Sequence, residues 1–152
     1  MNLDEIRDMW REDCKIDQND LDTENFKCTV IHEKYLNIWS HFRLMLSDAE
    51  TKGKMLYKEK FEYYAGKAPA AVYAKNPFNH KVLKGDLTTY IWADEDWLKN
   101  KQKIDYLQTV INYLEMILKQ CSNRGFQIKN YLELRKHADY CCLLYTSDAA
   151  DE

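Results

Sequence analysis

The sequence predicts an all-α protein made of long helices, with a central loop containing Pro and Gly and a helical C-terminal region. Two observations support this fold class. Only 4 Gly and 2 Pro occur in 152 residues, so few positions favour turns. Apolar residues also recur at heptad spacing over two long stretches, 31–49 and 104–121. Such long uninterrupted periods are typical of helices and not of strands.

The first helices are expected in the N-terminal half. A short polar helix over residues 3–13 comes first, and the acidic cluster at 17–22 interrupts it and supplies N-cap side chains for the next helix. That helix begins near residue 22 and continues to Gly66, which is placed to cap its C-terminus. Its apolar seam is Ile31, Tyr35, Ile38, Phe42, Met45 and Ala49.

The helical period is lost over residues 66–93. Pro69 and Pro77 lie in this stretch, and they predict a loop or linker of roughly twenty residues. A loop of this length in a compact domain is expected to be functional or mobile. Leu87–Trp92 is β-branched and aromatic, which favours a short strand or an extended packing segment.

A second long helix is expected after Asp94, whose side chain would cap it. Gly125 is predicted to end this helix, and residues 126–135 fit a last short one. Two apolar columns run along the long helix, more than one partner helix can cover, so we expect self-association to bury the remainder. The expected oligomerisation residues are Ile104, Leu107, Ile111, Leu114 and Leu118.

Charge is divided unevenly along the chain. Residues 1–25 carry nine acids against three bases, whereas residues 51–84 carry eight lysines against two acids. Cys142–Glu152 reads as the translation of a transposase adapter used in sequencing libraries, so we expect it to be an artefact and leave it out of fold prediction. Without its three acids the net charge of −3 becomes zero. A basic middle of this kind suggests a surface that binds polyanions.

Residue patterns that would indicate catalysis are missing. A phosphate-binding loop ending at Gly66-Lys67 would need Gly where Phe61 stands. Cys28 and His32 lie one helical turn apart but lack two further zinc ligands. Asp94–Asp96 could hold a nuclease metal, although a helix start at that point favours capping. We therefore expect no enzyme activity, no cofactor and no metal.

The segment Tyr57–Tyr64 is the strongest candidate site because it interleaves lysines with aromatic rings. Lysines pair with phosphates and rings stack on unpaired bases, which is the combination that binds single-stranded nucleic acid. The competing interpretation places the rings in the core and leaves the lysines merely solvated. The candidate DNA-binding residues are Lys54, Tyr57, Lys58, Lys60, Tyr63, Tyr64 and Lys67.

Three segments resemble the UvsY family, recombination mediators of T-even-like bacteriophages. Lys58–Tyr64 with Ala65-Gly66 is similar to the family's Lys-Ala-Arg-Leu-Asp-Tyr-Tyr-Ser-Gly. Ala93–Lys99 is similar to its Ala-Asp-Lys-Asp-Val-Leu-Lys, and Arg124–Lys129 to its Arg-Gly-Phe-Ala-Ile-Lys. The resemblance covers residues 1 to 138, and the tail from Cys142 has no counterpart in it.

The resemblance implies a non-enzymatic function. A family member would bind single-stranded DNA as a ring-like homo-oligomer, a hexamer or heptamer, and would load a RecA-like phage recombinase onto DNA covered by the phage single-strand-binding protein. It would do so in the cytoplasm of the infected bacterial host, and no membrane would be among its partners. Lys58 and Lys60 would contact DNA by position, although the family has Arg in place of Lys60 and Ala in place of Glu59, which puts the affinity in question.

The functional division expected along the chain has three parts. Residues 1–93 would form an N-terminal helical region with the DNA-binding segment, 94–141 the oligomerisation region, and 142–152 the artefactual tail. The alternative interpretation is a non-enzymatic helical scaffolding protein of a phage. A third and weaker one is a small nuclease that uses the Asp94 cluster.

Overall fold

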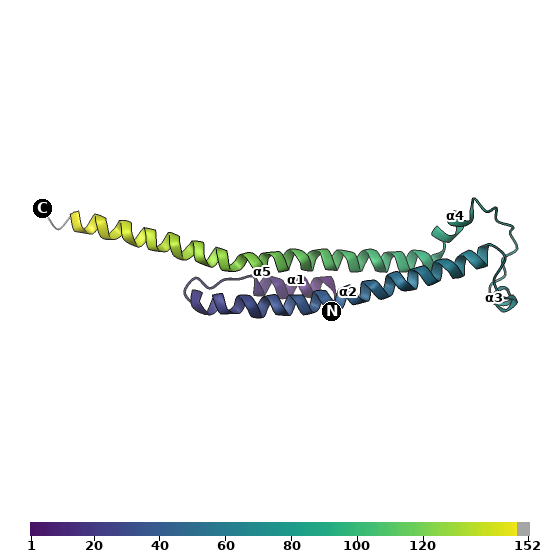
Figure 1. The fold of residues 1–152 in the computed structure, drawn as a ribbon, viewed down its shortest axis with the longest axis horizontal. Coiled ribbons are helices and arrows are strands. Elements are labelled where there is room, and N and C mark those ends of the chain that lie inside the picture. Colours follow the sequence, from purple (N-terminus) through teal and green to yellow (C-terminus); the bar gives the residue numbers. More distant parts are fainter. Residues whose placement is uncertain (149–152) are drawn as a thin grey trace. The chain divides into compact units, whose positions relative to one another are not determined.

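The computed structural model describes the backbone of residues 1–148 and the side chains of residues 1–138. The described backbone is all-α and contains no strand, which confirms the predicted fold class. Its helices, shown in Figure 1, are α1 (Leu3–Asp13), α2 (Leu21–Tyr64), α3 (Ala70–Lys75), α4 (Leu87–Trp92) and α5 (Glu95–Asp148). The tail predicted to be an artefact falls on this last helix up to Asp148 and beyond it on residues outside the described ones.

Packing divides the chain into two compact units. Unit 1 contains residues 1–38 and the chain from Tyr113 onward, and unit 2 contains residues 39–112. Both long helices contribute to both units, so packing groups the chain differently from the functional division expected at residue 93. That functional division stays a prediction.

Polar side chains cap the first two helices, and the cap of the second was predicted from the sequence. Asn2 Oδ1 accepts a hydrogen bond from Glu5 N at 2.9 Å, and Asn2 N donates back to the Glu5 carboxylate at 3.0 Å. This reciprocal pair is a capping box, which satisfies two backbone donors at the start of α1. Asp20 accepts a bond of 3.3 Å from Thr23 N at the start of α2. The acidic cluster therefore supplies an N-cap.

Unit 1 is a packing of α1 against α2 and α5. Trp10 of α1 meets Tyr35 of α2 edge-on, with ring centroids 5.5 Å apart. The guanidinium of Arg7 lies 5.8 Å from the ring centroid of Tyr113 on α5. Ile6 and Tyr35 are completely buried, so the short polar helix contributes directly to the core of this unit.

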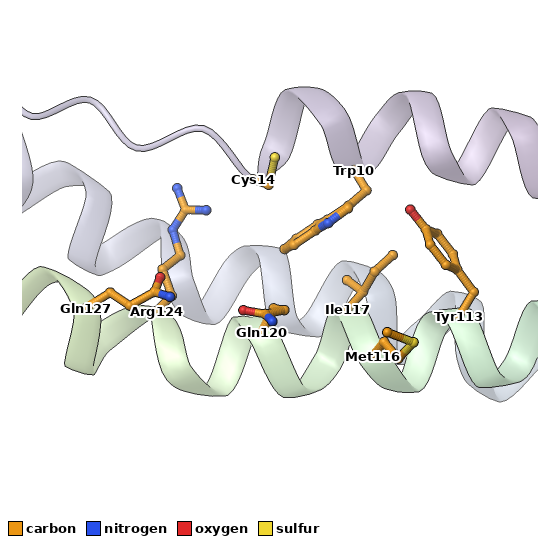
Figure 2. A pocket seen from close by; sticks show the side chains of 8 residues that line it. All are labelled: Trp10, Cys14, Tyr113, Met116, Ile117, Gln120, Arg124 and Gln127. Atoms are coloured by element: carbon orange, nitrogen blue, oxygen red, sulfur yellow. The ribbon is translucent and has the colours of Figure 1, made fainter.

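Arg124 of α5 ties the segment after α1 to both long helices. Its side chain is 4% exposed and donates to the backbone oxygens of Asp13 and Lys15, at 2.8 and 2.6 Å, and to Glu24 at 2.6 Å. Figure 2 shows this side chain extending from α5 toward the segment after α1, beside Trp10 and Cys14. A buried Arg with three acceptors fixes where the chain turns between α1 and α2.

Two glycines of this region have separate roles: Gly53 packs beside α5, and Gly66 caps the C-terminus of α2. A Cβ on Gly53 would lie 2.7 Å from Asn100 Nδ2 of α5, so any larger residue there would require the Asn100 side chain to move. Gly66 has φ of +74°, and Lys67 N and Gly66 N donate to Glu62 O and Tyr63 O at 2.8 and 3.2 Å. These bonds form the Schellman cap predicted for this position.

The expectation of an extended segment at Leu87–Trp92 is wrong, because these residues form helix α4. The backbone oxygen of Asp86 accepts from both Thr89 N and Tyr90 N. Leu87 and Ile91, four residues apart, are both buried on one side of the helix. The predicted loop at 66–93 accordingly contains two short helices, α3 and α4.

The expectation that Gly125 ends a helix is also wrong, because α5 continues through it to Asp148. A Gly inside a helix costs only about 1 kcal/mol relative to Ala. Arg124 and Ile128 on either side of it are both buried, so packing outweighs that cost.

The wide apolar face of α5 is largely covered within the chain. Leu107, Ile111 and Leu114 are at most 2% exposed, and Ile104 and Leu118 are half-buried. Self-association was expected because one partner helix is too narrow to cover this face, but in unit 1 α1 is a second partner helix in addition to α2. The part played by these five residues in assembly stays a prediction. Among the described side chains of α5, the large apolar ones that are most exposed are Met116, Phe126 and Leu134, and Leu98, Tyr106 and Leu132 are exposed to a smaller extent.

Candidate nucleic-acid interface

Lys60 lies at the centre of an ionic cluster where α2 meets the start of α5. Its Nζ is 2.9 Å from Asp94 Oδ1 and 2.6 Å from Asp96 Oδ2, and the side chain is 16% exposed. Tyr64 donates its hydroxyl to Asp94 at 2.8 Å. Asp94 also caps α5, because its Oδ1 accepts from Asp96 N at 3.0 Å. Lys60 is therefore occupied by two carboxylates and is not free to pair with a phosphate.

The pKa values in this cluster reflect competition between burial and pairing. Burial alone would raise the pKa of Asp94, but hydrogen bonds from Lys60 and Tyr64 outweigh it and hold that pKa below the ordinary value. Burial would lower the pKa of Lys60, but the bonds to Asp96 and Asp94 raise it. Burial, followed by the bond to Asp94, raises the pKa of Tyr64 to about 12. At neutral pH Asp94 and Lys60 are therefore both charged, whereas Tyr64 keeps its proton and donates it to Asp94.

The rings at the end of α2 pack on other rings of the protein. Tyr63 stacks on Tyr73 of α3 with centroids 5.4 Å apart, and Tyr64 contacts Phe78 and Tyr90 at 5.2 and 5.7 Å. The hydroxyl of Tyr73 donates to Tyr63 O at 2.7 Å. This aromatic cluster joins the connection after α2 to α4, so Tyr63 and Tyr64 are half-buried and already contact several rings of the protein.

The remaining predicted lysines face solvent. Lys58 is 78% exposed and lies 3.8 Å from Glu62, a surface pair that contributes little. Lys54 and Lys67 are exposed and form no ion pair with any side chain of residues 1–138. Tyr57 is half-buried and meets Trp97 of α5, with ring centroids 5.6 Å apart. The structure thus separates the predicted residues into exposed cations and packed rings.

Sequence reasoning missed three contributors to this region. Asp94 and Asp96 were expected at a helix start or, in the weaker alternative, in a nuclease metal site, and their pairing with Lys60 was not anticipated. Trp97 carried no signal of its own, since one aromatic residue near a helix start is usual in any core. A Lys buried between carboxylates could be anticipated only if the approach of α2 to α5 at this position were known.

The described part of the chain contains neither a metal-binding cluster nor a membrane-spanning helix. No group of three or more His, Cys, Asp or Glu side chains there could hold a metal ion. No helix there is both long and apolar enough to cross a membrane.

Comparison with known proteins places the chain in a family. The sequence model described as "Recombination, repair and ssDNA binding protein UvsY" matches residues 9–139. The chain belongs to the UvsY family. A comparison with curated proteins found no match. The UvsY match includes the segment at the end of α2, the start of α5 and the buried Arg124.

Solved structures of UvsY share the fold. The crystal structure of the recombination mediator protein UvsY of bacteriophage T4 in lattice type II has a TM-score of 0.81 at 24% identity, covering 91% of this chain and 98% of that one. Lattice type IV gives 0.76 at 24%, covering 91% and 99%. Lattice type I gives 0.79 at 23%, covering 88% and 98%. The all-α architecture is therefore that of UvsY.

Proposed function

We propose that this chain is a recombination mediator that binds single-stranded DNA. It would promote loading of a RecA-like recombinase onto DNA covered by single-strand-binding protein, in the cytoplasm of an infected bacterial host. Membership of a family described by recombination, repair and binding of single-stranded DNA supports the proposal. The observation in the structure that supports it is the set of exposed lysines beside the packed rings of unit 2.

Phosphate contacts belong to the lysines that solvent can reach. Lys54 and Lys58 are four residues apart on α2, so they share one face and lie about 6 Å apart along the helix axis. Lys67 follows the Gly66 cap. Contacts to phosphates do not distinguish one base from another, so binding is expected to be independent of the DNA sequence.

Lys60 acts in this proposal as a positioning residue. Removing its ammonium would leave the carboxylate of Asp94, which is 9% exposed, without its cation. Breaking a buried pair in this way is costly because the remaining charge stays desolvated. Its replacement is therefore expected to disturb the junction of α2 with α5, and with it the exposed lysines nearby.

Assembly into a ring-like homo-oligomer completes the proposal. The region 94–141 would drive it, as the resemblance implies. Phe126 and Leu134 are 69% and 70% exposed on α5, which makes them better candidates for contacts between subunits than the buried Leu107, Ile111 and Leu114. Many copies of a weak lysine site on one strand would then raise the affinity through avidity.

Measuring affinity for single-stranded DNA against salt tests the proposal. The affinity of the parent protein should fall steeply, by about 0.7 in log K per log unit of salt for each phosphate that is neutralised. Replacing Lys54 and Lys58 by Ala should weaken binding and reduce this slope by about 1.4. The matched control is Lys101→Ala, since Lys101 is exposed on α5 but paired with Asp105 at 3.2 Å.

Two outcomes would count against the proposal. Binding that does not depend on salt, or a parent that binds no single strand, would favour the scaffolding interpretation. Loading is tested separately by adding the chain to a recombinase and DNA covered by single-strand-binding protein. Faster filament assembly is expected, and an unchanged rate would contradict the mediator assignment.

A further inference from the structure

A cavity on the face shared by α2 and α5 in unit 2 is not explained by the ionic cluster or the aromatic cluster. Its volume is about 630 Å³, within the range of about 300–1,000 Å³ that small-molecule sites have. The lining residues are Glu50, Gly53, Lys54, Tyr57, Trp97 and Ile104.

Two features of the helices create this hollow. Gly53 lines the hollow without a side chain, so no side chain of α2 fills the hollow at this position. Tyr57 and Trp97 form one wall, with ring centroids 5.6 Å apart and ring planes inclined at 65°. Both rings are half-buried, so each keeps part of its surface open to a ligand.

The charge at the cavity favours a ligand that combines a flat ring with an anion. Lys54 belongs to the lining and has no carboxylate within ion-pair distance among the described side chains. Lys58 lies one turn further along the same face of α2 and is 78% exposed. Glu50 is the one acid in the lining. A base in the hollow would therefore carry its phosphates toward two lysines.

We propose that this cavity is a stacking subsite for one unpaired base of single-stranded DNA, with Trp97 as its platform and Lys54 as its phosphate contact. The inference rests on the proposed function and adds the place where a base is held. Aromatic platforms tolerate any base because every base has a π-face. Trp97 stands where the family segment quoted above has Val, so the platform is a property of this chain.

The test compares Trp97→Ala with the parent on two strands, an oligothymidine of about 16 nucleotides and an abasic strand of the same length. Loss of the platform should weaken oligothymidine binding about tenfold and leave abasic binding unchanged. Trp97→Phe should retain most of the affinity. Tryptophan fluorescence of the parent should be quenched by oligothymidine, and this quenching should be lost in Trp97→Phe.

The control is Trp92→Ala, which removes a Trp that is 61% exposed on α4, outside the cavity. It should bind both strands as the parent does. Equal affinity of Trp97→Ala and the parent for oligothymidine would overturn the inference while leaving the proposed function intact. A change in oligomer mass with unchanged DNA affinity would also overturn it, because the cavity would then be a contact between subunits. A parent that binds neither strand would instead overturn the proposed function.

Discussion

Asp94 has two roles at the residue scale, because one carboxylate caps α5 and also pairs with a cation from α2. Its Oδ1 accepts from Asp96 N and lies 2.9 Å from Lys60 Nζ, and its Oδ2 accepts from Tyr64. An Asn at this position would still cap the helix, but it could not neutralise the ammonium. The two roles can therefore be separated by one substitution.

The pH dependence of stability should reveal this carboxylate. The pKa of Asp94 is lower in the folded protein than its ordinary value of 3.8. Its contribution to the stability of the fold is therefore complete above pH 3.8 and is lost as the pH falls through the folded pKa. Because Lys60 would still be paired with Asp96, Asp94→Asn should lower the free energy of unfolding at pH 7 by about 2 kcal/mol and make the melting temperature less sensitive to acid. Melting curves between neutral and acidic pH measure both effects. Equal acid sensitivity of the two proteins would show that another group is responsible.

Alkaline pH should also destabilise the ionic cluster, because Lys60 and Tyr64 lose their protons. The raised pKa values of Lys60 and Tyr64 mean that their contributions are complete below 10.5 and 10.0 and are lost as the pH rises through the folded values. For Tyr64 the loss is spread between pH 10.0 and about 12. Tyr64→Phe should lose stability at neutral pH and should depend less on alkaline pH. Thermal melts at alkaline pH, with Tyr90→Phe as control, check this expectation.

At the element scale, Gly125 and Gly66 form a matched pair. A Cβ at Gly125 would meet nothing within 4 Å in the helical interior of α5, so Gly125→Ala should raise the free energy of unfolding by about 1 kcal/mol. A Cβ at Gly66 would also meet nothing, but its φ of +74° disfavours any L side chain. Gly66→Ala should therefore lower stability by about 1 kcal/mol. Urea midpoints measure both, and a destabilised Gly125→Ala would contradict a continuous helix.

Helices were predictable wherever local signals agreed. The seam of α2, its acidic N-cap and the Gly66 cap are all short-range features, and the structure contains each of them. At Leu87–Trp92 the residue types favour strands, but the described backbone contains no partner strand and Asp86 O accepts the first helical bonds. Tertiary context overrode propensity there. Gly125 failed as a stop signal because its cost is small beside the packing of its neighbours.

The candidate site was less predictable than the helices. Its exposed lysines were visible in the sequence, because a cation on a polar helix face is a local property. The pairing of Lys60 with residues more than thirty positions away was not, because it depends on the approach of two helices. The cavity beside Trp97 also depends on this approach, because Gly53 and Tyr57 of α2 line it together with Trp97 and Ile104 of α5.

At the scale of the whole molecule, assembly can be separated from folding. Phe126→Asp with Leu134→Asp alters exposed positions of α5, so it should lower the oligomer mass and leave helical circular dichroism unchanged. Leu114→Asp places a charge at a fully buried position and should unfold unit 1. Light scattering and circular dichroism on both variants distinguish the two effects. A parent that is monomeric at micromolar concentration would contradict the assembly proposal.

Affinity for long single strands should follow the oligomer mass. Phe126→Asp with Leu134→Asp removes no lysine, yet it should weaken binding because later contacts cease to be intramolecular. A short oligonucleotide that reaches one subunit should bind the variant and the parent equally well. If a folded monomeric variant bound a long strand as tightly as the parent, avidity would have no part in binding.

The bond from Tyr64 to Asp94 joins residues 30 positions apart, and so it closes the base of the whole connection between α2 and α5. Chain length inside a closed loop is inexpensive, since doubling it costs about 0.6 kcal/mol in closure entropy. Asn79, His80, Lys81 and Lys84 are exposed within it. Insertions within residues 79–84, whether acquired in evolution or engineered as a peptide tag, should therefore leave both long helices undisturbed.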